Sequence, residues 1–222
     1  MLPLFPLGTV LFPGLVLPLH VFEERYRRLV ADLLALPEQE RELGVVALRE
    51  GHEVGAGGAR ALHAVGCTAR LHQVHRHDDG RYDLVTVGSR LFRVLTLHQP
   101  EQHPYLTADV EWLPDEPGDL VEAEVLATAV RAELRGYLAA LGDAGGREIE
   151  VPALAEDPLV LSHQVAATVL LDLADRQDLL DQPDGRTRLR RELTVLRRES
   201  AFLRVLTAAP APELTRTPYS LS

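Results

Sequence analysis

Hydrophobic positions along the chain follow two different periods, and the change from one to the other divides the sequence into two parts. Between residues 43 and 115, apolar and polar residues alternate, as in VGCTARL at residues 65–71. Alternation places successive side chains on opposite faces and is typical of strands with one buried face. From residue 120 onward, apolar residues recur every three or four positions, which predicts helices with one apolar face. The pattern therefore predicts an α+β protein with a β-rich first half and a helical second half.

Turn signals divide the alternating segment into several short strands. We expect strands at residues 43–49, 65–76, 81–89, 90–98 and 105–113. The dipeptide Asp79-Gly80 lies between the second and the third of these strands and is a strong hairpin signal. Short strands at this spacing favour a closed or nearly closed barrel, because closure leaves few sheet edges exposed.

The first 22 residues carry no formal charge, yet they differ from a membrane-spanning or targeting segment. Pro3, Pro6, Pro13 and Pro18 interrupt this stretch, and they would break a spanning helix repeatedly. A secretory signal opens with positive charge, whereas the first basic residue here is Arg25. We therefore expect short buried strands within residues 2–21, with prolines at their ends and bends.

A helix is predicted directly after these opening strands. Apolar residues at three- and four-residue spacing share one face of it, namely Phe22, Tyr26, Leu29, Val30, Leu33 and Leu34. Pro37 cannot continue a helix and is expected to end it.

The second half of the chain predicts a series of helices. Residues 120–141 have the spacing of one long helix, and Asp157 followed by Pro158 is a favourable N-cap and first helical residue. A short helical unit is expected near residues 174–181, and a long final helix with an arginine-rich outer face is expected after Asp184. We expect the chain to divide into a strand-rich part at residues 1–116, a helical part at residues 117–207 and a flexible tail at residues 208–222.

Composition narrows the function classes. The formal net charge is −10, which disfavours a broad electrostatic grip on nucleic acid or on an anionic membrane. Every basic residue is arginine, and the chain contains no lysine. Cys67 is the single cysteine, so an internal disulfide and a multi-cysteine zinc site are both excluded. A cytoplasmic location is the simplest expectation for such a chain.

The densest polar cluster lies at the predicted hairpin. His72, His75, His77 and Asp79 occur within LHQVHRHDD, and residues 75 and 77 point to the same side of a strand. A metal-dependent hydrolase that uses these side chains is therefore one alternative. Because the spacing fixes no third ligand, we favour a polar hairpin tip in solvent, and we expect no metal, no cofactor and no catalytic residue.

A second candidate surface combines aromatic and arginine side chains. Phe22, Tyr26, Arg90, Phe92 and Arg93 belong to residue types that are enriched at binding hot spots. The alternative is that Phe22, Tyr26 and either Leu91 or Phe92 are core residues, and we favour this alternative because large aromatic residues usually pack inside.

Three stretches of the sequence resemble a known family. They are PLFPLGTVLFPGLVLPLHVFEERYRRLV, VGCTARLHQVHRHDDGRYDLVTVGSRLFRVL and LSHQVAATVLLDLADRQDLLDQPDGRTRLRRELTVLRRE. In this order they are similar to the substrate-binding N-terminal domain of Lon proteases, across roughly residues 2–207. Cys67 stands where that family commonly has threonine, and both are small residues compatible with a strand.

The resemblance implies a PUA-like β pseudo-barrel with one helix, followed by a helical bundle. It also implies a non-catalytic module that binds unfolded polypeptide or a protein partner, as an adaptor or chaperone-like factor in protein quality control. An ATP-dependent protease is one candidate partner. Catalysis is not implied, because a phosphate-binding loop and a serine–lysine peptidase pair both need a lysine that this chain lacks.

RNA binding is a further alternative, since PUA-like barrels elsewhere bind RNA. The acidic balance and the absence of lysine argue against it, so we expect no nucleic acid and no membrane among the partners. The client and the oligomeric state are left open by the sequence.

Overall fold

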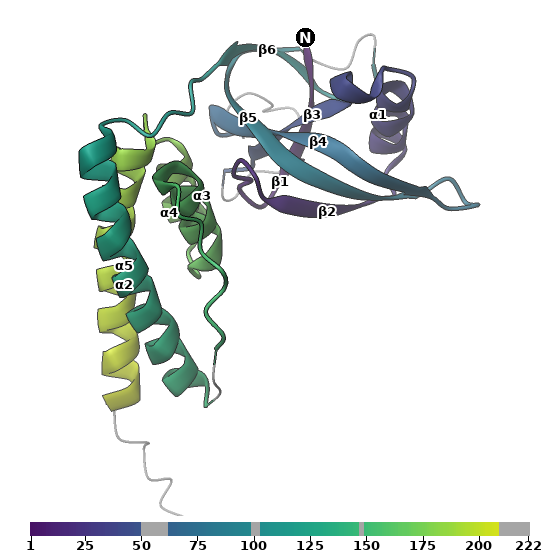
Figure 1. Ribbon diagram of the computed structural model, residues 1–222. Coiled ribbons are helices and arrows are strands. Elements are labelled where there is room, and N and C mark those ends of the chain that lie inside the picture. The colour runs from purple at the N-terminus through teal and green to yellow at the C-terminus, as the bar shows by residue number, and fades with distance from the viewer. Residues whose placement is uncertain (50–61, 99–102, 147–148, 209–222) are drawn as a thin grey trace, which may run out of the picture.

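A computed structural model describes residues 1–49, 62–98, 103–146 and 149–208 (Figure 1). Its strands are β1 (Leu2–Leu7), β2 (Val16–Val21), β3 (Glu42–Ala47), β4 (Val65–Arg76), β5 (Tyr82–His98) and β6 (Thr107–Trp112). Its helices are α1 (Glu24–Leu34), the 3-10 turn η1 (Glu38–Glu40), α2 (Leu120–Gly145), α3 (Pro158–Thr168), α4 (Leu173–Leu180) and α5 (Gly185–Ala208). We call residues 1–112 the strand half and residues 120–208 the helical half.

The six strands form one sheet whose ends meet. Its order is β2-β5-β4-β3-β1-β6, and β5 pairs additionally with β6. Neighbouring strands are antiparallel except β1 and β3, which run parallel. The first part of β5 pairs with β2 and β4, while Phe92 to His98 pair with β6. Strand β5 therefore closes β4, β3, β1 and β6 into a ring of hydrogen-bonded strands.

Two predicted details of the strand half are wrong. The segments 81–89 and 90–98 are one continuous strand, because β5 changes its partner along its length without a turn. Residues 9–15 are predicted to belong to a strand, but they form a turn between β1 and β2, in which Gly14 has a φ of +76°. Phe12 is nevertheless fully buried in this turn, and its carbonyl oxygen would lie 2.1 Å from a Cβ at position 88. Gly88 is therefore needed where the turn crosses β5.

Helix α1 covers one opening of the strand ring. Tyr26, Leu29, Val30 and Leu33 are buried as predicted, because they share the inner face of the helix. Phe22 is not on this face: the helix begins at Glu24, and the Phe22 side chain is 62% exposed. The prediction that Phe22 belongs to the inner face of the helix is wrong.

The helical half is built on two long helices, α2 and α5, that pack along each other, with α3 and α4 beside them (Figure 1). Side chains of Asp119, Asp157 and Asp172 accept backbone N–H bonds at the first turns of α2, α3 and α4. The N-cap predicted at Asp157, followed by Pro158, is confirmed. Among the described residues, none of the helices is both long enough and apolar enough to cross a membrane.

Helices α3 and α4 also pack against the strand half. Ala166, Leu179 and Leu180 belong to the same apolar cluster as the buried residues of the strands. Gln177 donates a hydrogen bond to the carbonyl oxygen of Val65 on β4, at 3.1 Å. The change from strands to helices falls between Trp112 and Leu120, and the predicted tail lies outside the described residues from position 209 onward.

Candidate functional site

An open groove of about 650 Å³ lies between helix α1 and strand β6. The C-terminal part of α1 forms one wall, and the ends of β1 and β6 form the other. We call it the α1–β6 groove, and its lining includes Leu33, Leu36, Arg90, Tyr105, Val110 and Trp112.

Trp112 is the most conspicuous side chain of this groove. Residues 92 and 112 are paired in register on β5 and β6, so both side chains lie on the same face of the sheet. Phe92 is fully buried, whereas Trp112 at the end of β6 is 45% exposed, and their rings meet edge to face at 6.4 Å. The buried phenylalanine thus supports a tryptophan that solvent can reach.

Arg90 lies over the ring of this tryptophan. Its guanidinium carbon is 3.8 Å from the centre of the Trp112 ring, a cation–π contact. Nη2 of Arg90 donates to one carboxylate oxygen of Glu42 at 3.1 Å, and Nη2 of Arg70 donates to the other at 2.6 Å. The carboxylate on β3 therefore holds the arginine in place against the ring.

The Glu42 carboxylate is buried but ionised. Burial alone would raise its pKa, but the hydrogen bonds from Arg70 and Arg90 outweigh burial and lower the pKa below its ordinary value. The ion pairs of Glu42 are therefore present at neutral pH.

The opposite wall of the groove carries a second hydrogen-bonded pair. The Tyr105 hydroxyl donates to a carboxylate oxygen of Asp32 at 2.8 Å, and Arg28 reaches the other oxygen of Asp32 at 2.9 Å. Burial, together with the Asp32 carboxylate, raises the pKa of Tyr105 to about 12. Tyr105 is therefore a neutral donor at physiological pH, and Asp32 contributes negative charge to the rim.

A second groove of about 560 Å³ lies on the other side of α1, between this helix and strands β1 and β2. We call it the β2–α1 groove, and Phe22 and Tyr26 contribute to its lining. Tyr26 is stacked on Phe5 with ring centres 4.2 Å apart, and the guanidinium carbon of Arg25 lies 4.6 Å from the Tyr26 ring. Burial is the main cause that raises the pKa of Tyr26.

The structure distributes the five predicted binding residues over four places. Phe22 and Tyr26 line the β2–α1 groove, whereas Arg90 lines the α1–β6 groove. Phe92 is a core residue, as the alternative expectation held, and solvent does not reach it. Arg93 lines neither groove and pairs with Glu111 at 2.8 Å. The sequence did not indicate Trp112 as a surface residue, because its position in the alternating pattern of β6 is that of a buried side chain. The structure shows that Trp112, the last residue of this strand, is exposed to solvent.

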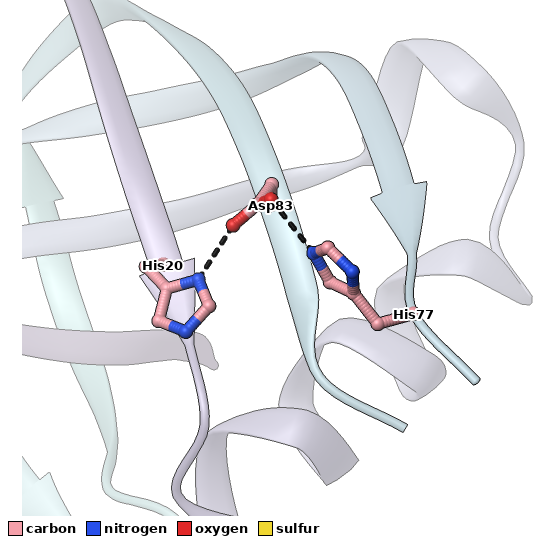
Figure 2. A group of neighbouring side chains, drawn as sticks. All are labelled: His20, His77 and Asp83. Carbon is pink, nitrogen blue, oxygen red and sulfur yellow. Dashed lines mark hydrogen bonds and ion pairs between the residues drawn. The ribbon is translucent and has the colours of Figure 1, made fainter. Parts of the chain in front are cut away.

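The structure gathers only part of the predicted histidine cluster: the rings of His75 and His77 meet edge to face, with their centres 4.8 Å apart. Asp79 pairs with Arg81 at 2.7 Å, and His77 instead meets Asp83 and His20 (Figure 2). These three form the group of metal-capable side chains found within the described part of the chain. His72 and Asp79 are not members of it. Sequence spacing could not show this group, because His20 and Asp83 are 63 positions apart.

Cys67 is a buried core residue, as the alternation of its strand predicts. Burial raises the pKa of its thiol to about 12, so the reactive thiolate form is disfavoured at neutral pH.

Open grooves with apolar and aromatic walls on a mixed α+β scaffold are typical of domains that contact another molecule through their surface. The family model of the ATP-dependent protease La (LON) substrate-binding domain matches residues 1–198. Because this match covers most of the sequence, the chain belongs to that family.

Curated relatives are Lon proteases. The Lon protease of Anaeromyxobacter dehalogenans is 30% identical over 221 residues, which cover 97% of this chain and 26% of that protein. The Lon protease of Escherichia coli is 27% identical over 205 residues, which cover 92% of this chain and 25% of that protein. The chain thus spans about a quarter of the length of these relatives.

Solved structures support the same assignment. A Lon N-terminal domain protein from Xanthomonas campestris matches with a TM-score of 0.60 and 27% identity, over 87% of this chain and 96% of that chain. The N-terminal domain of a Mycobacterium avium complex Lon protease matches with a TM-score of 0.62 and 20% identity, over 90% of this chain and 97% of that chain. The second likeness concerns the fold alone.

Proposed function

We propose that this chain binds exposed apolar segments of polypeptides in the α1–β6 groove. The observation that carries the proposal is Trp112, the single tryptophan, which is half exposed and contacts both Phe92 and Arg90. Tryptophan, tyrosine and arginine are the residue types enriched at binding hot spots. In a member of a substrate-binding family, such a cluster in an open groove is the best candidate for the contact with a client.

The chemistry of the groove indicates which segments it would favour. Leu33, Leu36 and Val110 offer apolar surface, whose burial contributes roughly 25 cal/mol per Å² before ordering costs. Asp32 and Asp109 lie at the same groove, and the whole chain carries a net charge of −10. We therefore expect preference for apolar segments that are flanked by basic residues, and repulsion of strongly acidic ones.

The finer assignments belong to the same proposal. We infer that the closed strand ring is the PUA-like pseudo-barrel and that the four helices are the bundle implied by the family resemblance. We further infer a non-catalytic, cytoplasmic adaptor or chaperone-like role, with an ATP-dependent protease as a candidate partner. The family match and the lysine-free sequence support this reading.

Fluorescence anisotropy with labelled, reduced and carboxymethylated α-lactalbumin tests the proposal. We expect the unfolded probe to bind and native α-lactalbumin to bind much more weakly. Trp112→Ala should weaken binding at least about tenfold, because it removes the centre of the aromatic cluster. Phe202→Ala is the matched control, since Phe202 is a similarly exposed aromatic residue on the distant helix α5.

Two results would contradict the proposal. One is an unfolded probe that does not bind, and the other is an equal loss of affinity in Trp112→Ala and Phe202→Ala. A loss in Phe22→Ala with no change in Trp112→Ala would place the client in the β2–α1 groove instead.

A further inference from the structure

Two histidines converge on a single carboxylate at the outer surface of the strand half. Figure 2 shows Asp83 between the rings of His20 and His77, with each ring directed at it. Nδ1 of His20 lies 2.5 Å from Oδ1 of Asp83, and Nε2 of His77 lies 2.7 Å from Oδ2. One potential ligand atom from each of the three residues lies within 4.8 Å of the others.

Regular backbone structure fixes the positions of these side chains. His20 on β2 and Asp83 on β5 are directly paired in register, so their side chains leave the same face of the sheet. His77 opens the hairpin turn, in which its N–H binds the carbonyl of Arg81 and its carbonyl accepts the N–H of Gly80. Gly80 has a φ of +83°, as this tight turn requires. The three residues are therefore brought together by strand pairing and by a defined turn.

We propose that His20, His77 and Asp83 bind a zinc ion, with water in the remaining coordination position. Two imidazoles and one carboxylate form a donor set that suits zinc, whereas magnesium and calcium prefer oxygen ligands. Zinc forms bonds of about 2.0–2.2 Å to such ligands. Small movements of the three side chains around an inserted ion would therefore replace the two hydrogen bonds by metal bonds.

The surroundings leave the ligand atoms accessible. His20 and Asp83 are about half exposed, and both line an open hollow of about 470 Å³ on this face of the sheet. A positive charge beside the ligand atoms is Arg81, whose Nη1 lies 3.5 Å from Nε2 of His20. Nε of Arg81 donates to the Asp79 carboxylate at 2.7 Å. A metal on Nδ1 of His20 would leave the ring proton on Nε2, so Nη1 of Arg81 could no longer donate to Nε2 and would have to turn away. Arg81 is therefore the competitor of the metal.

The bound ion would join strand β2 to the β4–β5 hairpin. His20 also lines the β2–α1 groove, and its ring centre lies 6.1 Å from that of Phe22. Zinc would thus fix the edge of the β2–α1 groove. This proposed role is separate from the binding of polypeptides beside Trp112, which lines the α1–β6 groove.

Calorimetric titration of the EDTA-treated full chain with zinc chloride tests the proposal, and cobalt(II) provides a second measurement. We expect one zinc ion per chain, and a cobalt(II) spectrum with the intense visible bands of a low-coordinate site. His20→Ala, His77→Ala and Asp83→Asn should each weaken zinc binding at least about tenfold. Arg81→Ala should tighten zinc binding, because it removes the competing charge.

His98→Ala is the matched control. His98 and Asp109 form another exposed histidine–carboxylate pair, in which Nε2 of His98 lies 2.8 Å from Oδ2 of Asp109. This pair contains one histidine and not two. Zinc binding in this variant should be unchanged, and circular dichroism should show that every variant is folded. Absence of zinc binding in the native chain overturns the proposal, and so does zinc binding that survives in folded His20→Ala and His77→Ala.

Discussion

In the strand half, charged side chains lie at the rims of the grooves, and the buried carboxylate of Glu42 is paired with two half-exposed arginines, whereas in the helical half an arginine and a carboxyl group both lie inside the packed helices. Arg90 and Asp32 belong to the open α1–β6 groove. On α5, by contrast, Arg188 and Glu192 are each only 1% exposed. Groups that can meet a ligand are thus gathered in the first half, while the second half uses polar groups internally.

The buried arginine connects several segments. Its Nε donates to the carbonyl of Leu179 on α4 at 3.0 Å, and its Nη1 donates to the hydroxyl of Ser162 on α3 at 3.0 Å. Nη1 also lies 3.9 Å from Asp115, in the connection between β6 and α2, and Asp115 binds His163 at 2.9 Å. The helical half therefore fixes the connection between the two halves through a buried polar network.

Phe92→Ala should have the largest effect on stability, because the strand half depends on apolar packing. Removing this fully buried ring leaves a cavity beneath Trp112, and the expected loss is about 3–5 kcal/mol of unfolding free energy. Urea denaturation followed by circular dichroism measures it. Phe202→Ala, at an exposed position on α5, should change stability by less than about 0.5 kcal/mol.

Arg188→Leu should destabilise the protein by about 3 kcal/mol, because Asp115 and Ser162 would lose a buried partner. The same denaturation measurement applies. Arg190→Leu is the control, since Arg190 lies on the same helix but pairs with Glu122 at the surface. Equal stability of the two variants would mean that the buried network of Arg188 does not stabilise the helical half.

Much of the fold follows from local patterns in the sequence. The change of hydrophobic period separates strands from helices, Asp79-Gly80 marks the observed hairpin, and Asp157 caps α3 as expected. These features depend on neighbouring residues only. The continuous strand β5 was not predicted, because alternation does not reveal where a strand changes its partner.

The sites were less accessible to sequence reasoning, because they depend on contacts between distant segments. His20 meets Asp83 only through the pairing of β2 with β5. Trp112 has the spacing of a core residue, and its exposure comes from its position at the end of β6. Residue type indicated aromatic and arginine side chains as candidates for a binding surface, but it could not separate the buried Phe92 from the exposed Phe22.

Glu192→Met tests whether a buried carboxyl group without hydrogen-bond partners lowers the stability of the helical half. Neither carboxylate oxygen of Glu192 has a hydrogen-bond partner within the described residues, and burial raises its pKa well above the ordinary value. Methionine should therefore stabilise the protein by about 1–2 kcal/mol at neutral pH. Because the folded-state pKa is raised, the native protein should lose stability as pH rises above about 4. Thermal denaturation across pH should show this loss in the native chain and not in Glu192→Met.

Glu42→Gln tests the opposite case, a buried carboxylate in the strand half that is fully paired. The variant loses the charge that holds Arg70 and Arg90, and the expected loss of stability is about 1 kcal/mol at neutral pH. The pKa of Glu42 is lowered in the folded state, so this contribution is present above the unfolded-state pKa of about 4.3 and disappears as pH falls through the lower folded-state value. The stability difference between native chain and variant should therefore shrink in acid, which is the reverse of the dependence expected at Glu192.

The same variant has a local optical readout. Arg90 would lose its anchor and move from the Trp112 ring, so the fluorescence of the single tryptophan should change. Glu111→Gln is the control, because Glu111 pairs with Arg93 at the exposed surface and its loss should cost less than about 0.5 kcal/mol. An unchanged Trp112 emission in Glu42→Gln would mean that the ring, and not the carboxylate, holds Arg90 in the groove.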